Sequence, residues 1–119
     1  MNLANTNNIS THLTDDKSSA FVINKVKEIV HCYDKNAEII LFGSRARGDW
    51  GEESDWDFLI LISKKITPDL KKRIIYDMHD IELEENVLLQ VLIKNKNDWE
   101  TKYLNSPLYL NIQDEGKSV

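Results

Sequence analysis

The feature that most constrains the fold is an almost uninterrupted apolar stretch, "DWDFLILI", at residues 55–62. A second stretch of this kind, "AEIILF", occupies residues 37–42. Continuous apolar runs that are rich in β-branched and aromatic residues are typical of strands in the interior of a sheet. The polar and glycine-containing segment between the two runs is long enough to turn the chain back. The two runs therefore predict neighbouring strands.

Helices and one further strand are predicted around this pair. Apolar side chains recur at spacings of three and four over residues 18–33, which predicts an amphipathic helix. Thr67 before Pro68 predicts the start of a second helix, because threonine caps a helix well and proline fits its first turn. The apolar stretch "NVLLQVLIKN" at residues 86–95 predicts a third strand.

The last part of the chain carries two more helix signals. Asn97 with Glu100 three residues later matches a capping box, and Ser106 before Pro107 matches another capped helix start. Gly116 predicts the end of the last helix. The predicted order of helices and strands indicates an α/β (α+β) fold with a small mixed sheet.

The chain length of 119 residues suits one domain with one hydrophobic core. The sequence contains neither an internal repeat nor a low-complexity tract. Residues 1–16 are rich in asparagine and threonine and poor in hydrophobic side chains. We therefore expect a flexible N-terminal leader at residues 1–16, followed by the domain at residues 17–119.

Composition argues against several classes of protein. The formal net charge of −5 disfavours bulk binding to nucleic acid, which requires a basic surface. One cysteine, Cys32, allows neither an internal disulfide nor a multi-cysteine zinc site, and the three histidines lack ligand spacing. No apolar segment approaches the roughly 20 residues of a membrane span, and residues 1–20 do not resemble a signal peptide. We therefore expect a cytoplasmic protein without a membrane segment.

Two aspartates begin the second apolar strand. Asp55 and Asp57 are two residues apart, so on a strand their side chains project from the same face. Two neighbouring carboxylates at the start of a buried strand repel each other and need a compensating charge. A divalent cation such as Mg²⁺ supplies that charge, because it prefers carboxylate oxygens. The alternative is that Asp55 caps a turn and Asp57 meets an arginine. We call Asp55 and Asp57 the acidic pair.

A glycine and a serine follow the first apolar strand. Gly43 allows a ligand to approach the backbone closely, and the hydroxyl of Ser44 with the amides of a short helical turn could hold a phosphate. Arg47, and less favourably Arg45, could reach the same anion with a fork of donors. A glycine and serine before a helix are also a common cap. We call Gly43, Ser44 and Arg47 the phosphate cradle.

Taken together, these motifs resemble a known family. A Gly-Ser pair, ten intervening residues and an Asp-x-Asp pair are similar to the signature of the minimal nucleotidyltransferase family, within the superfamily that includes DNA polymerase beta. The resemblance is dense over residues 39–62 and looser over residues 68–116. It implies a single-domain nucleotidyltransferase fold, in which helices pack on one face of a small mixed sheet and the nucleotide cleft lies on the other.

The resemblance also implies roles for these residues. Gly43 and Ser44 would hold the triphosphate of a nucleotide, and Arg47 would brace its phosphates. Asp55 and Asp57 would be the catalytic residues and would bind two Mg²⁺ ions. The implied reaction transfers a nucleoside monophosphate, most simply AMP from ATP, to an acceptor hydroxyl.

One position departs from the family pattern. The superfamily usually carries a third carboxylate on the next strand, where this chain aligns Gln90. A glutamine can offer an amide oxygen to a metal but cannot accept a proton as a base. The alternatives are that Gln90 is an ordinary hydrogen-bonded residue, or that the register is shifted toward the glutamates upstream, which are Glu82, Glu84 and Glu85.

Two functions are therefore expected from the resemblance. In the first, the protein is an adenylyltransferase that modifies a tyrosine of a HEPN-domain toxin and so acts as its antitoxin. In the second, it is a catalytically impaired subunit that neutralises or scaffolds such a partner by contact. A small-molecule acceptor such as an aminoglycoside is a weaker alternative, and a homodimer could complete the cleft. Trp50 is the best candidate for stacking on a base, ahead of Trp56 and Trp99, although packing explains each of them.

Overall fold

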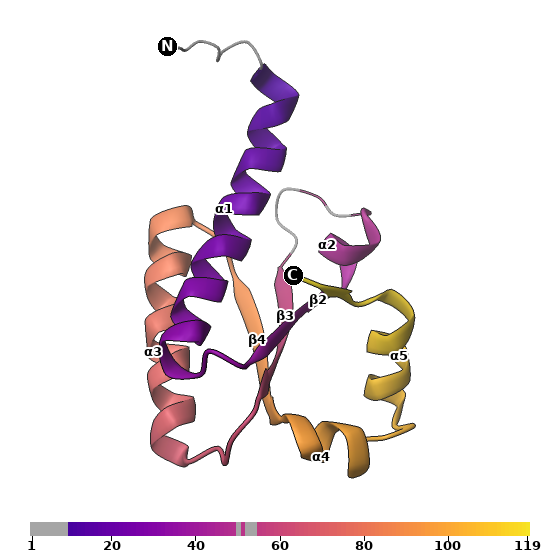
Figure 1. The fold of residues 1–119 in the computed structure, drawn as a ribbon. Helices are drawn as coiled ribbons and strands as arrows, with labels where there is room; N and C mark the ends of the chain where they lie inside the picture. The colour runs from indigo at the N-terminus through magenta and orange to yellow at the C-terminus, as the bar shows by residue number, and fades with distance from the viewer. Residues whose placement is uncertain (1–9, 50, 52–54) are drawn as a thin grey trace.

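A computed structural model describes residues 10–49, 51 and 55–119 of the protein. The elements in chain order are α1 (Ser10–Tyr33), β2 (Glu38–Phe42), α2 (Ser44–Arg47), β3 (Trp56–Ile62), α3 (Pro68–Glu85), β4 (Leu89–Asn95), α4 (Lys96–Thr101), α5 (Pro107–Glu115) and β5 (Lys117–Ser118) (Figure 1). None of the helices in these ranges is both long enough and apolar enough to cross a membrane.

The four strands form one mixed sheet in the order β4–β3–β2–β5. Strand β2 pairs antiparallel with β3 and with β5, whereas β3 and β4 are parallel and are connected through α3. Strand β3 lies between two neighbours, and its residues Phe58, Leu59 and Ile60 are fully buried. The predicted mixed sheet and the pairing of the two apolar runs are therefore confirmed. The two-residue strand β5 was not predicted.

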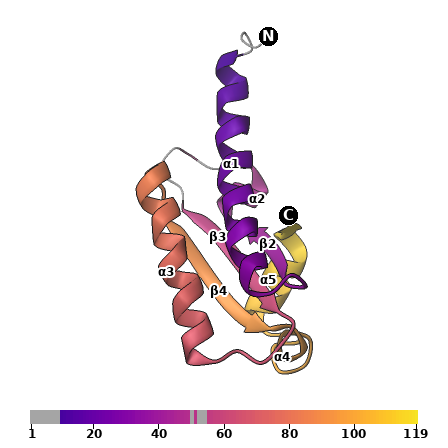
Figure 2. The same cartoon turned by 60° about the vertical axis from the view of Figure 1, so that its left-hand side comes forward.

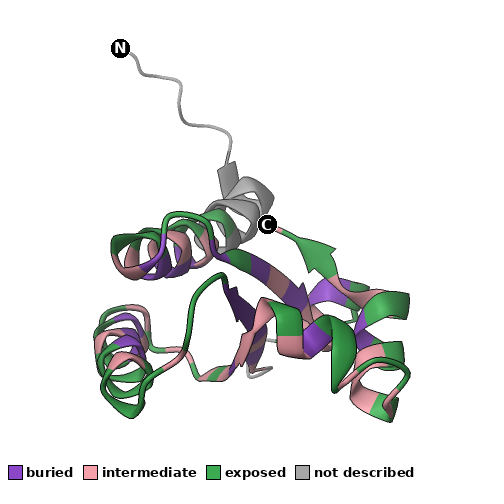
Figure 3. Ribbon diagram, turned by 60° about the horizontal axis from the view of Figure 1, so that its bottom comes forward, coloured by how far each residue is buried: buried purple, intermediate pink, exposed green. Residues whose placement is uncertain are grey.

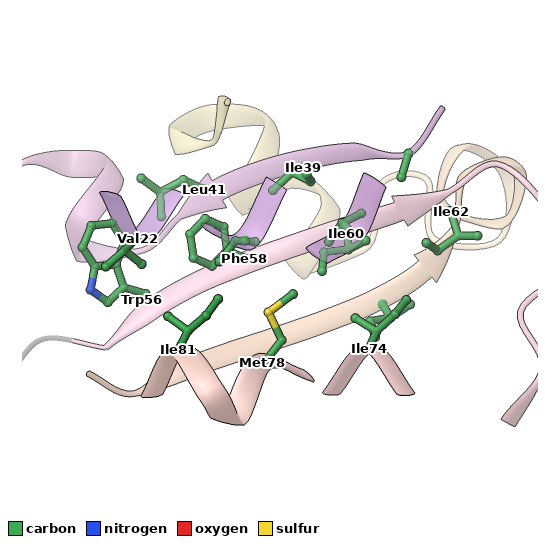
Figure 4. Packing of buried hydrophobic residues seen from close by; sticks show 14 of the residues in the cluster. Val22, Ile39, Leu41, Trp56, Phe58, Ile60, Ile62, Ile74, Met78 and Ile81 are labelled. Carbon is green, nitrogen blue, oxygen red and sulfur yellow. The ribbon is translucent and has the colours of Figure 1, made fainter. Parts of the chain in front are cut away.

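Successive residues of β3 face two different cores. Phe58 and Ile60 point to the face covered by α1 and α3, where Val26 and Ile74 are buried with them (Figure 4). Leu59, which points the other way, packs in a second core that is built around α4 and α5. The second core contains Leu59, Leu61, Trp99 and Ile112.

Helices consequently cover both faces of the sheet. Figures 1 and 2 show the long helices α1 and α3 on one side and the short helices α4 and α5 on the other. The expectation that helices pack on one face is met by α1 and α3. It is wrong for α4 and α5, which cover the opposite face. A strand that is apolar on both sides must be covered on both sides, which explains the second layer. Figure 3 shows the resulting pattern, in which most of β3 and the inward sides of the helices are buried, whereas β5 is exposed.

Two predicted helix starts are confirmed and one is wrong. The backbone N–H of Leu70 donates to Thr67 Oγ1 at 3.1 Å, and a corresponding bond from Tyr109 N–H to Ser106 Oγ measures 3.2 Å. Helix α4, however, is capped by Asn95, whose Oδ1 accepts from Asp98 N–H at 3.0 Å. Strand β4 ends at Asn95 and leads directly into the helix, so the predicted cap residue Asn97 lies inside the first turn.

The boundaries of two elements differ from their predicted positions. Helix α1 begins at Ser10, within the segment that we expected to form the leader, and residues 1–9 lie outside the described residues. The division into a leader and a domain therefore stays a prediction. Strand β4 begins at Leu89 because α3 continues to Glu85 and ends in the left-handed residue Asn86, with φ of 53°.

Candidate nucleotide and metal site

The end of β2 and the start of β3 bring the sequence-predicted site residues together. The antiparallel register places Phe42 of β2 opposite Asp57 of β3. Gly43, the next residue after Phe42, therefore lies beside Asp57. On its other side, Asp57 is in register with Gln90 of β4. By strand alternation Asp57 lies on the same face as Leu59, which is the face that α4 and α5 cover.

Gly43 and Asp57 approach each other closely. A Cβ atom added at Gly43 would lie 2.1 Å from Asp57 Oδ2, a distance that real Cβ atoms essentially never show, and 3.0 Å from its Cγ. The φ angle of Gly43 is 76°, in the region that L-residues with side chains rarely adopt. Glycine is therefore required here for two separate reasons, and the backbone of the phosphate cradle directly contacts the acidic pair.

The environment of Asp57 disfavours its negative charge. Partial burial raises the pKa of Asp57 above its usual range, and the charges of Asp55 and Glu115 raise it further, while Arg47 opposes the shift. A bound cation would relieve this repulsion. In residues 10–49, 51 and 55–119 no group of three or more His, Cys, Asp or Glu side chains could hold a metal. The acidic pair nevertheless fits Mg²⁺, which is often held by one or two carboxylates and completes its shell with water and phosphate oxygens.

Gln90 is directed at the acidic pair. Its Nε2 donates to Asp55 Oδ2 at 2.7 Å, and the donor must be the glutamine because an ionised carboxylate can only accept. Two of the three glutamates upstream, Glu82 and Glu84, have other partners. Glu82 accepts from Leu89 N–H at 3.0 Å and contacts His79 at 2.8 Å, and Glu84 lies 3.6 Å from Lys25.

The two arginines of α2 lie on opposite sides of that helix. Arg47 donates through Nη1 to Glu115 Oε2 at 2.9 Å and through Nε to Asp49 Oδ2 at 3.2 Å. Arg45 lies over the ring of Trp56, with its Cζ 4.3 Å from the ring centroid. Because Trp56 belongs to the core of α1 and α3, Arg45 is on the side away from Glu115. Desolvation lowers the pKa of Arg45, which fits a stacked, half-buried guanidinium.

Glu115 is a site residue that the sequence analysis did not identify. Its Oε2 accepts from Gly43 N–H at 2.8 Å as well as from Arg47, and its side chain is only 11% exposed. The residue lies at the end of α5, more than half the chain away from Gly43. The packing of α5 in the second core and the pairing of β5 with β2 bring the two together, and a strand as short as β5 has no recognisable sequence pattern.

The tryptophans do not form a stacking surface for a base among the described residues. Trp56 is 3% exposed and Trp99 is 2% exposed, and each is buried in one of the two cores. Trp50, the favoured candidate for base stacking, lies outside the described residues, as do the loop acids Glu52 and Glu53.

Comparison with known proteins decides the family. The family described as polymerase beta nucleotidyltransferase matches residues 24–115, which include the whole phosphate cradle and the acidic pair. The chain belongs to this family. The nucleotidyltransferase resemblance and the fold class drawn from the sequence are therefore confirmed.

One relative of this nucleotidyltransferase and one solved structure of similar fold add detail. A Methanocaldococcus jannaschii protein named "Putative protein adenylyltransferase MJ0141" is 43% identical over 63 residues. That match covers 53% of this chain and 64% of the relative, so less than two thirds of the relative's length is matched. A solved structure titled "Crystal structure of the toxin-antitoxin with AMP-PNP" aligns over 80% of this chain and 69% of its own, with a TM-score of 0.57 and 16% identity. At that identity the likeness shows a shared fold.

Proposed function

We propose that this nucleotidyltransferase transfers AMP from ATP to an acceptor hydroxyl in a Mg²⁺-dependent reaction. The observation that carries the proposal is the direct contact between Gly43 and Asp57, which brings a candidate phosphate site and a candidate metal site to one point. A triphosphate with its metal ions could occupy both sites at once, because Mg²⁺ takes carboxylate oxygens and phosphate oxygens as ligands together.

Each residue then has a chemical task. Asp55 and Asp57 hold the metal, and Gln90 keeps Asp55 oriented through the 2.7 Å hydrogen bond. Gly43 lets the phosphates approach the backbone closely and Ser44 presents its hydroxyl to them, while Arg47 opposes the negative charge that develops during transfer. Two bound Mg²⁺ ions would polarise the α-phosphate and stabilise the leaving pyrophosphate.

The proposed acceptor is a tyrosine of a HEPN-domain toxin, which would make this protein a cytoplasmic antitoxin. Two comparisons support this extension. One relative is named as a protein adenylyltransferase, and a protein of the same fold is found in a toxin–antitoxin structure that contains AMP-PNP. A homodimer that completes the cleft remains part of the proposal, and no role in nucleic-acid binding is proposed.

One observation favours a second function. Gln90 stands in register with Asp57 and donates to Asp55, so the neighbouring strand offers an amide at this point and no carboxylate. An amide cannot take the proton of the attacking hydroxyl. The alternative is therefore a catalytically impaired subunit that neutralises or scaffolds its partner by contact alone.

Mass spectrometry separates the two functions. The purified protein is mixed with ATP, Mg²⁺ and the protein encoded beside it, and the masses of both chains are measured. A gain of one AMP on the partner, which is lost in the Asp55→Asn/Asp57→Asn variant, supports transfer. Asp80→Asn, which removes an exposed carboxylate of α3, is the matched control and should retain transfer. A tight complex without any AMP gain supports the binding subunit.

A further inference from the structure

Glu115 binds two of the three residues of the phosphate cradle. One oxygen, Oε2, accepts from Gly43 N–H at 2.8 Å and from Arg47 Nη1 at 2.9 Å. The two donors belong to residues that the proposed function assigns to the nucleotide phosphates. Charge-assisted hydrogen bonds of this kind are stronger than neutral ones and fix the direction of a guanidinium.

The backbone around Glu115 is held in place on both sides. Strand β5 pairs with β2 so that Leu41 is opposite Lys117, and continuing this register by two residues brings Gly43 opposite Glu115. At Gly116, an added Cβ would lie 2.5 Å from the carbonyl oxygen of Ile112 and 2.8 Å from Ile40 Cγ2. The end of α5 therefore packs too tightly against β2 for residue 116 to carry a side chain, and Glu115 has little freedom to move.

Arg47, by contrast, needs such an anchor. Its side chain is 47% exposed, and a free arginine loses rotamer entropy when it binds a ligand. A partner that orients the guanidinium beforehand removes part of this cost from binding. The same partner holds the amide of Gly43 at the end of β2, where strand pairing with β3 has ended.

We propose that Glu115 is a positioning residue for the nucleotide: through its bonds to Gly43 N–H and Arg47 Nη1 it holds the turn after β2 and the guanidinium in the orientation that the phosphates require. The inference rests on the proposed function and names a residue of the same site that acts through others. Its carboxylate also adds negative charge beside Asp57, which favours a cation at the acidic pair.

The test compares Glu115→Gln with Asp114→Asn. Asp114 is a neighbouring exposed acid of α5, and its substitution removes the same charge. Calorimetric titration with Mg²⁺ and AMP-PNP measures nucleotide affinity, and the transfer assay measures kcat and KM for ATP. Glu115→Gln should weaken AMP-PNP binding on the order of tenfold and raise KM, with kcat at saturating ATP nearly unchanged. Asp114→Asn should bind like the wild type.

A double-mutant cycle shows whether Glu115 acts through Arg47. If it does, Arg47→Lys/Glu115→Gln should bind AMP-PNP about as weakly as Arg47→Lys alone. Unchanged or tighter binding by Glu115→Gln would overturn the proposal, because a carboxylate that merely competes with phosphate gives tighter binding when it is neutralised. If Glu115→Gln does not fold, Glu115→Asp keeps the charge with a shorter reach and should show the same loss. A wild type that fails to bind AMP-PNP at all overturns the proposed function as well.

Discussion

The backbone of Gly43 lies against the carboxylate of Asp57, so closely that a Cβ at residue 43 would come 2.1 Å from Asp57 Oδ2. The end of β2 and the acidic pair at the start of β3 are therefore in direct contact. A change at either residue should therefore alter both metal and nucleotide binding.

Gly43→Ala should lower the free energy of unfolding by about 1–3 kcal/mol, because it combines a disfavoured φ angle with a clash against Asp57. Gly48→Ala is the matched control. Gly48 has a similar φ of 88°, but nothing lies within 4 Å of an added Cβ. Urea denaturation of both variants separates the two causes, and equal losses would show that the contact with Asp57 is unimportant.

Asp57→Asn should stabilise the metal-free protein by on the order of 1 kcal/mol at neutral pH while abolishing transfer. Burial, Asp55 and Glu115 raise the pKa of Asp57 in the folded state. An acid with a raised folded-state pKa contributes its stability at low pH and loses it as the pH rises through that pKa. The advantage of the variant should therefore grow with pH. Thermal melts in a chelator from about pH 4 to 8 measure it. A pH-independent difference would contradict the predicted repulsion.

Gln90→Glu should make stability more dependent on Mg²⁺. A third carboxylate beside Asp55 adds repulsion in the metal-free protein and a ligand when the metal is bound. The rise in Tm on adding Mg²⁺ should exceed that of the wild type, since a ligand that binds the folded state stabilises it. Gln90→Leu, which removes the hydrogen bond without adding charge, should show no such gain. An equal rise in both variants would place the metal away from this residue.

Arg45 and Arg47 should have separable effects. Arg45→Ala removes the stacking on Trp56 and should cost about 1 kcal/mol of stability with little change in nucleotide affinity. Arg47→Ala should weaken nucleotide binding but change stability little, because its ion pairs are exposed and contribute little to folding. Denaturation and AMP-PNP titration of both variants test this assignment. The reverse pattern would move the phosphate site to the other side of α2.

Features that depend on neighbouring residues could be predicted from the sequence. Thr67 and Ser106 predict the starts of their helices correctly, because the cap residue and the proline after it both act within one helical turn. The acidic pair was recognisable because strand alternation alone puts both side chains on one face. At Asn95 a local signal misled, since a strand residue that runs straight into a helix can cap it better than the apparent capping box.

Features that depend on distant pairing could not be predicted. Strand β5 has two exposed residues and no periodicity, so nothing in its own sequence marks it as a strand. Glu115 reaches the site through this strand, through the fit of Gly116 against Ile40 and through the packing of α5 in the second core, and all three are contacts between distant parts of the chain. The two short helices α4 and α5 were predicted, but their position on the second face of the sheet was not. Each of them buries few residues, so its own sequence does not indicate which face it covers.

The shortness of β5 has a consequence for the local stability of the sheet edge beside the site. Two exposed residues secure this strand to β2, supplemented by the bond from Val119 N–H to Ile39 O at 3.0 Å. Amide protons in such a marginal ladder exchange with solvent through local opening, at a lower free-energy cost than those of the central sheet. The pairing of β5 with β2 should therefore open more readily than that of the central strands, while the packing of α5 in the second core keeps Glu115 beside Gly43 and Arg47.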